Sequence, residues 1–201
     1  MPKIVDQSQR RAAIIEACWQ VIAESGLSAA RVRAVAARAQ MSPSALRHWF
    51  ASQAELHAAA LTELSDRPVE RIRNAAQRQM SGRDLARLVL EELLPLDEAR
   101  TLECTVWYAF LLDPALPTEL ESITRRFWHQ ELWATRMAVA LLRGSDVPPD
   151  DQTALSGSDE QTAHLMRSAI DGLAVEGVVF GADAQVSTRL GELLDLLSPA
   201  A

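Results

Sequence analysis

Residues 31–56 read RVRAVAARAQMSPSALRHWFASQAEL, and this stretch decides the predicted fold. Its first part, 31–38, repeats apolar side chains at helical spacing and predicts a short helix. Ser42 followed by Pro43 is a start signal, because a serine side chain caps free backbone N–H groups and proline has no N–H to satisfy at the first helical position. A second short helix is therefore predicted over 43–49, after a tight turn.

The two short helices need a neighbour on which to pack. A two-turn helix is not stable alone in water, so we expect the second one to dock through Leu46 and Phe50. Upstream, apolar residues recur at helical spacing over 7–25, and Gly26 ends that helix. Helix, short helix, turn and capped short helix form the helix-turn-helix arrangement, whose second short helix enters the major groove of DNA.

The side chains of the second short helix suit that placement. Those at its N-terminal end are small, which lets the backbone approach the base edges: Ser42, Pro43, Ser44 and Ala45. Those at its other end are where phosphates would lie: Arg47, His48 and Trp49. The N-terminus of the next helix, at Ser52 and Gln53, offers free N–H groups to an anion. Taken singly, Arg47 and His48 are equally consistent with a solvated face, and Trp49 with core packing.

The charge distribution supports a DNA-binding head. The net charge of −7 alone argues against a nucleic-acid binder. Residues 1–60, however, hold seven basic and four acidic side chains, a net charge of +3, which leaves −10 for residues 61–201. This asymmetry fits a cationic head that meets phosphates and an acidic body that does not.

The segment 26–56 resembles the TetR family of bacterial one-component regulators. The resemblance lies in VRAVA at 32–36 with Ala39, in MSPSALRHWF at 41–50, and in SQAEL at 52–56. Three positions depart from the family pattern. Gln40 replaces the usual turn glycine, Arg47 stands where a tyrosine commonly contacts phosphate, and Gln53 stands where a phosphate-binding lysine is frequent.

The resemblance implies that Arg33 contacts a base or a phosphate and that the second short helix carries sequence specificity. Arg47 keeps a phosphate role with added charge, whereas Gln53 loses a charge but can still donate a hydrogen bond. The candidate DNA-contacting residues are Arg31, Arg33, Ser42, Pro43, Ser44, Ala45, Arg47, His48, Trp49 and Gln53.

The remainder of the chain predicts an all-α protein of about nine helices. From Ser52 a long helix runs onward, with a break or bend expected near Pro68. Further helices are predicted over 83–94, 97–112, 117–143, 159–180 and 184–198, and a surface loop over 144–159. We predict a helix-turn-helix DNA-binding domain over 1–51 and an effector-binding and dimerisation domain over 52–201.

The body is similar to the subgroup that contains the choline-sensing repressor of betaine synthesis. This similarity lies in LLPLDEAR at 93–100, Glu103, and VWYAFL at 106–111. It implies that helices four to seven enclose an effector pocket and that the last two helices form a four-helix bundle with a second subunit.

Aromatic side chains gather on the segments around 107–110 and 127–133. Ring faces beside Glu103 or Glu131 suit a cationic ligand, whereas an apolar or aromatic ligand suits the same surroundings, and core packing is the plain alternative for each ring. The candidate pocket residues are Glu103, Trp107, Tyr108, Phe110, Trp128 and Trp133.

The last two helices have apolar faces at helical spacing, as an isologous helix bundle requires. The candidate dimer-interface residues are Leu165, Ala169, Leu173, Val186, Leu190, Leu193 and Leu197. Packing within the chain's own core is the alternative for all of them.

The sequence predicts no metal site and no cofactor, since Cys18, Cys104 and the four histidines have no ligand spacing. We expect a cytoplasmic protein, because no signal segment or membrane span is visible. The sequence shows neither a nucleophile with its base nor a phosphate-binding glycine loop. Nothing in it therefore indicates an enzyme. We therefore predict a homodimeric regulator, more readily a repressor, that binds palindromic double-stranded operator DNA and is released by a small molecule of unknown identity. The alternative is a helical interaction module, or a ligand-binding protein, whose DNA affinity is weakened.

Overall fold

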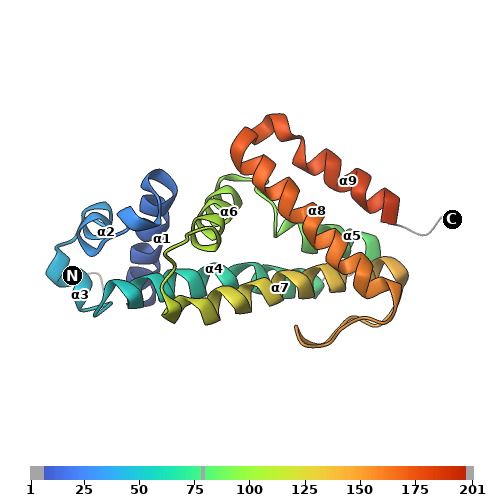
Figure 1. The fold of residues 1–201 in the computed structure, drawn as a ribbon, viewed down its shortest axis with the longest axis horizontal. Helices are drawn as coiled ribbons and strands as arrows, with labels where there is room; N and C mark the ends of the chain where they lie inside the picture. Colours follow the sequence, from blue (N-terminus) through green and yellow to red (C-terminus); the bar gives the residue numbers. More distant parts are fainter. Residues whose placement is uncertain (1–6, 78–79, 198–201) are drawn as a thin grey trace, which may run out of the picture. The chain divides into compact units, whose positions relative to one another are not determined.

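The computed structural model describes residues 7–77 and 80–197, and this part of the chain is all-helical (Figure 1). The predicted fold class is confirmed. The α-helices are α1 (Gln7–Ser25), α2 (Val32–Arg38), α3 (Pro43–Arg47), α4 (Gln53–Ala76), α5 (Gly82–Glu91), α6 (Glu98–Leu111), α7 (Thr118–Arg143), α8 (Ser158–Phe180) and α9 (Val186–Leu197). Short 3-10 segments, η1 (Leu27–Ala29) and η2 (Gly181–Ala184), lie before α2 and α9. None of these helices is both long enough and apolar enough to cross a membrane.

Several helix ends differ from the prediction, most of all that of α5, which ends at Glu91 rather than at residue 94. Helix α3 ends at Arg47, because the N–H groups of His48 and Trp49 turn to carbonyls three residues back, at 3.2 and 2.9 Å. Helix α4 has no break at Pro68 and continues to Ala76. A proline removes one helical hydrogen bond, and here the flanking turns keep the helix continuous.

The chain forms two compact units, which we describe separately. The first comprises the described residues up to Leu64 together with Thr105–Thr124, and the second comprises Ser65–Cys104 and the described residues from Arg125 onward. The unit boundaries fall inside α4, α6 and α7. The predicted functional boundary between residues 51 and 52 is a separate question and stays a prediction.

The core of the first unit fixes α1 against α4. Trp19 of α1 is fully buried, and its Nε1 donates a hydrogen bond to the Ala60 carbonyl at 3.1 Å. The buried His57 of α4 is paired at 2.8 Å with the Ala30 carbonyl, so its Nε2 carries the proton. Its ring also meets Phe110 edge-on, at 6.0 Å between centroids. These contacts hold the chain immediately before α2 on a preformed helix. Leu46 and Phe50 are buried, as the docking of α3 required.

The second unit has its own core around α4, α5 and α7. Ile72, Val89, Ala134 and Met137 form a buried cluster there. Helix α8 packs closely at Gly177, where an added Cβ would lie 2.5 Å from the Pro95 side chain. A glycine is therefore required at this position for steric reasons.

Candidate functional site

The turn between α2 and α3 is built by three local features. Ser42 caps α3, its hydroxyl accepting a hydrogen bond from Ala45 N at 3.1 Å, and Pro43 is the first helical residue. Gln40 has a φ of +53°, in the left-handed region. That conformation favours glycine, which accounts for the glycine usual at this turn, and the glutamine adopts the same conformation at a steric cost. The predicted cap and turn are thus confirmed.

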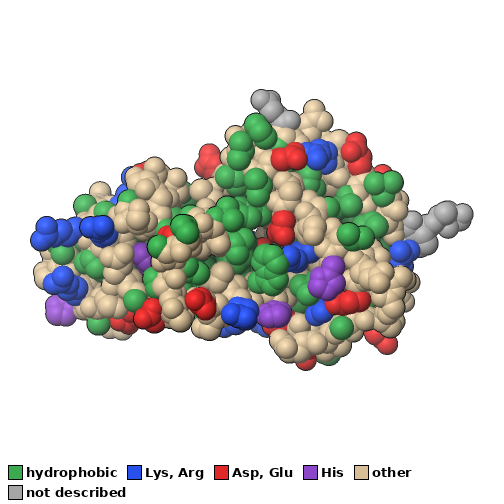
Figure 2. All heavy atoms as spheres, viewed as in Figure 1, with side chains coloured by type: hydrophobic (Ala, Val, Ile, Leu, Met, Phe, Trp, Pro, Cys, Tyr) green, Lys and Arg blue, Asp and Glu red, His purple; other side chains and the backbone are tan. Residues whose placement is uncertain are grey.

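Two of the head's basic side chains are bound to their own chain. Arg38 donates to Gln20 Oε1 at 2.9 Å and pairs with Glu24. Arg31 Nε donates to the Ser28 carbonyl at 3.3 Å. Among the described residues, no hydrogen bond or ion pair attaches the exposed Arg33 and Arg47, which remain available to a ligand. Figure 2 shows basic side chains gathered at the end of this unit that holds α2 and α3.

The other predicted DNA-contacting residues differ in their exposure. Ser42, Pro43, Ser44, His48 and Gln53 are exposed, whereas Ala45 and Trp49 are half-buried. The Ser42 and Ser44 hydroxyls are 2.9 Å apart and share a hydrogen bond.

The start of α4 carries its own cap. Ser52 Oγ accepts from Glu55 N at 3.0 Å, and the Glu55 carboxylate accepts from Ala51 N at 2.7 Å. The first-turn N–H groups of Gln53 and Ala54 are those that a helix cannot satisfy internally. They are the ones that could meet a phosphate.

In the second unit a cleft of about 440 Å³ lies between α4, α7 and the segment that follows α7. We call it the α4–α7 cleft. Its walls combine an indole, an amide and charges of both signs. The lining residues are Val69, Arg73, Arg126, Gln130, Trp133, Pro149, Asp150 and Asp151.

A smaller inner pocket adjoins the cleft and shares Val69, Gln130 and Trp133 with it. Its free volume is only about 10 Å³, which is about the space of one water molecule. Gln130 Oε1 is buried there, and no donor among the described residues is hydrogen-bonded to it. The remaining lining residues are Ser65, Pro68, Ile72, Leu93, Phe127, Glu131 and Ala134.

Of the predicted pocket residues, Trp133 lines both cavities and the other five line neither. Trp107, Tyr108 and Phe110 belong to the first unit, where Trp107 and Phe110 are buried. Trp128 is 37% exposed on α7, and the guanidinium of Arg167 lies 3.3 Å from its ring centroid. Its ring is thus covered by a cation from α8.

Glu103 is bound by arginine. The Arg71 guanidinium donates to both of its carboxylate oxygens, at 3.0 and 2.6 Å, and also pairs with Glu92. These carboxylates raise the pKa of Arg71, although burial alone would lower it. The predicted role of Glu103 as a partner for a cationic ligand therefore needs revision, since its charge is already compensated.

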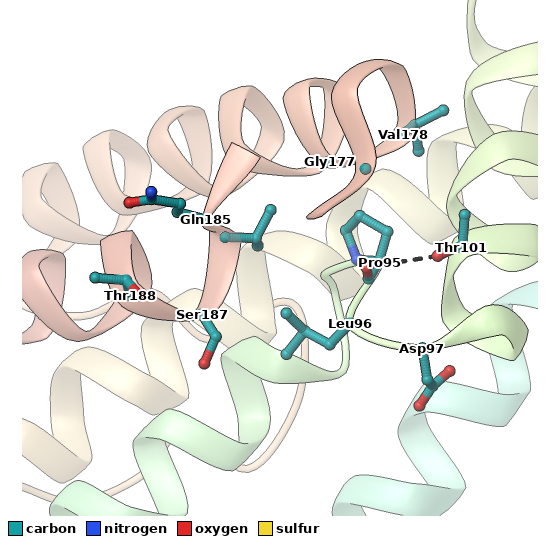
Figure 3. A pocket seen from close by; sticks show the side chains of 11 residues that line it. Pro95, Leu96, Asp97, Thr101, Gly177, Val178, Gln185, Ser187 and Thr188 are labelled. Carbon is teal, nitrogen blue, oxygen red and sulfur yellow. Dashed lines mark hydrogen bonds between the residues drawn. The ribbon is translucent and has the colours of Figure 1, made fainter. Parts of the chain in front are cut away.

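A further cavity of about 430 Å³ lies where α8 bends back into α9 (Figure 3). Figure 3 shows Pro95 next to Gly177, with Thr101 hydrogen-bonded to the Pro95 carbonyl, at 3.5 Å. The Asp97 carboxylate accepts hydrogen bonds from the backbone N and the Nε of Arg100, at 2.8 and 2.9 Å. No local sequence pattern indicates this cavity, because its lining comes from three separate segments.

The predicted dimer-interface residues divide into two groups. Leu173, Val186 and Leu190 are 5%, 6% and 0% exposed, so they belong to the core of the single chain. Leu165 is 72% exposed, and the half-buried ones are Ala169, Leu193 and Leu197. The outer apolar face of α8 and α9 instead includes residues that sequence reasoning missed: Val175, Val179, Phe180 and Leu196.

Gly172 lies on this outer face, in the middle of α8. An added Cβ there would meet nothing within 4 Å, unlike the crowded site of Gly177. A mid-helix glycine costs about 0.5–1 kcal/mol relative to alanine. No neighbour in the described part of the chain makes a glycine necessary there.

The head thus defines a helix-turn-helix DNA-binding protein. Residues 14–60 match the family described as bacterial regulatory proteins, tetR family. The HTH-type transcriptional regulator PksA of Bacillus subtilis (strain 168) is 38% identical over 110 residues, 55% of this chain and 54% of that protein. The match therefore spans about half of that relative's length.

Solved structures extend the likeness to nearly the whole chain. A transcriptional regulator from Rhodococcus sp. Rha1 is 30% identical, with a TM-score of 0.71 over 93% of this chain and 92% of that one. A putative transcriptional regulator from Saccharomonospora viridis, in complex with choline, shares the fold at a TM-score of 0.77 and 18% identity, over 95% of this chain and 96% of that one. The chain belongs to the tetR family of transcriptional regulators.

Proposed function

We propose that this regulator is a repressor that a small molecule releases from its operator. Residues 1–51 would bind DNA, and residues 52–201 would bind the effector and a second subunit. The observation that supports the proposal is the capped helix α3, which is in contact with α2; Ser44 and Arg47 of α3 and Arg33 of α2 are all exposed. Such a pair of helices reads a major groove.

A palindromic operator follows from a two-fold symmetric dimer. We place the interface on the outer face of α8 and α9, through residues such as Leu165, Val179 and Leu196, which the chain itself leaves exposed. Gly172 supports this location, because a glycine with open space around it allows the partner's helix to approach closely.

The α4–α7 cleft and the inner pocket together are our candidate effector site. The cleft alone has the volume of a typical ligand site, whereas the inner pocket is nearly filled. A ligand that enters the inner pocket must therefore displace side chains on α4 and α7, and both helices extend into the unit that carries α3. Binding energy spent on this displacement supplies the link to DNA release.

Two ligand classes fit the lining. The buried Glu131 with the rings of Phe127 and Trp133 accommodates an organic cation, and the choline bound to the Saccharomonospora viridis protein supports that class. The apolar side chains of the same pocket accommodate an uncharged ligand. Choline and its uncharged isostere 3,3-dimethylbutanol separate the two, with tryptophan fluorescence reporting binding and operator release measured in parallel.

The repressor proposal itself is tested by DNA titration. Purified protein is titrated with the intergenic DNA upstream of its own gene and with a scrambled duplex, at two salt concentrations. We expect selective binding with a steep salt dependence. Equal affinity for both duplexes would favour an interaction module with weakened DNA affinity.

A further inference from the structure

The segment 144–157, between α7 and α8, is tied down although it contains no helix. Trp133 Nε1 donates to the Pro148 carbonyl at 3.0 Å, and Arg136 Nη1 donates to the Asp151 carbonyl at 3.0 Å. Leu155 N donates to the Glu160 carboxylate at 2.9 Å. The main chain of the segment is thus attached to α7 and α8 at three points.

Two of these attachments depend on one ion pair, between the buried Arg136 and the half-buried Glu160. Arg136 is 7% exposed, and its Nε and Nη2 donate to the carboxylate of Glu160 at 2.6 to 3.1 Å. The Arg136 guanidinium thereby holds the carboxylate that in turn holds Leu155, while it binds Asp151 directly. Hydrogen bonds from Arg136 lower the pKa of Glu160, so the pair is charged at neutral pH.

The attached segment forms one wall of the α4–α7 cleft. Pro149, Asp150 and Asp151 line the cleft opposite residues of α4 and α7. Asp150 Oδ1 accepts hydrogen bonds from Gln152 N and from Thr153 N and Oγ1, at 3.1, 2.9 and 2.7 Å, which fold this wall into a turn. Trp133 therefore has two roles, since it lines both cavities and also anchors the segment through Pro148.

The ends of the segment are suited to movement. Gly144 and Gly157 have φ values of +65° and +56°, and an added Cβ at either would meet nothing within 4 Å. Glycine adopts these left-handed conformations without the cost that other residues incur. The anchored wall thus lies between two residues that readily change backbone conformation.

We propose that the segment 144–157 is a lid over the α4–α7 cleft, that Arg136 with Glu160 is its latch, and that solvent molecules and ligands reach the inner pocket past Trp133 when the lid opens. The inference rests on the proposed function only in treating the inner pocket as part of the effector site. The access route itself is a property of the folded chain and can be measured without knowing the effector.

The test uses a cysteine placed in the inner pocket. Ala134 is 2% exposed and lines that pocket, so Ala134→Cys puts a thiol behind the lid. The full-length protein is treated with methyl methanethiosulfonate, a small uncharged reagent, and modification of each cysteine is followed by peptide mass spectrometry. The fully buried Cys18 and the half-buried Cys104 stay as internal reporters of general unfolding, because burial raises the pKa of each thiol to about 12.

The latch variant is Arg136→Gln in the Ala134→Cys background. We expect it to raise the modification rate at position 134 by at least about tenfold, since several hydrogen bonds to the lid are lost, while Cys18 and Cys104 keep their rates. Trp133→Phe removes a single hydrogen bond and should raise the rate by about two- to twelve-fold. This milder variant carries the test if Arg136→Gln does not fold.

Arg143→Gln is the matched control. Arg143 lies at the end of α7 and pairs with Asp159 at 3.6 Å, but no hydrogen bond attaches it to the lid among the described residues. Its variant should leave the rate at position 134 unchanged. Unchanged rates in both test variants, or equal increases at all three cysteines, would overturn the lid. Either result leaves operator binding, measured separately, as the test of the repressor.

Discussion

The substitution Gly172→Ala is expected to have opposite effects on the stability of the single chain and on the affinity of the dimer. In the isolated chain its Cβ position is open, so Gly172→Ala should stabilise α8 by about 0.5–1 kcal/mol through helix propensity alone. If the partner's α8 crosses at this point, the added methyl group lies between two backbones. Overpacking of that kind costs about 1–3 kcal/mol.

The expected result is therefore a more stable subunit and a weaker dimer. A loss of about 1–3 kcal/mol raises the dimer dissociation constant by about 5- to 140-fold. Sedimentation velocity over a dilution series measures that constant, and thermal unfolding below it measures the stability of the subunit. Gly172→Leu should abolish the dimer.

Gly191→Ala on α9 is the matched control. Its Cβ would meet Arg87 of the same chain at 3.7 Å, which is an ordinary contact, so the dimer should keep its affinity. The reasoning fails if Gly172→Ala leaves the dissociation constant within twofold of the unmodified protein and Gly172→Leu still forms a dimer.

Three further predictions concern the head. If Arg33 and Arg47 contact phosphates, Arg33→Ala and Arg47→Ala should each reduce the salt slope of operator binding by about one; if either contacts a base, its loss should cost about 1–3 kcal/mol of binding free energy at one base position. Arg38 is paired within the chain, so Arg38→Ala should leave the slope unchanged. Equal slopes for all three variants would contradict the assignment. Ser42→Ala removes the cap of α3 and should lower stability by about 0.5–2 kcal/mol in urea unfolding, with no loss if the cap is unimportant. Burial lowers the pKa of His57 below 6.5, so the folded head binds fewer protons than the unfolded chain; stability should fall as the pH drops below about 6.5, and His57→Gln should remove this dependence.

The sequence was informative where the cause of structure is local. Ser42 and Pro43 define the start of α3 through a cap and a missing N–H group, and both features are present in the structure. The end of α3 was less predictable, because the last turn tightens through bonds whose formation depends on the docking of Phe50.

Apolar periodicity identified the correct helices but not what each face contacts. Leu190 and Leu196 are both apolar residues of α9, yet one is fully buried in its own chain and the other is 82% exposed. The same limit affected the pocket. Glu103 looked available to a ligand, because its partner Arg71 is 32 positions away in the sequence and no local pattern reveals their pairing.

Under the proposed function, a nearly filled inner pocket would give the regulator an adjustable threshold. When the binding-competent conformation is only a small fraction of the population, the apparent dissociation constant of a ligand is its intrinsic constant divided by that fraction. Smaller side chains at Ile72 or Leu93 would make opening easier and lower the effector concentration needed for release, while Glu131 and the two aromatic rings proposed to contact the effector stay in place. Bulkier packing would raise that concentration. The dose response of the regulated genes is therefore open to selection through residues that only occupy space.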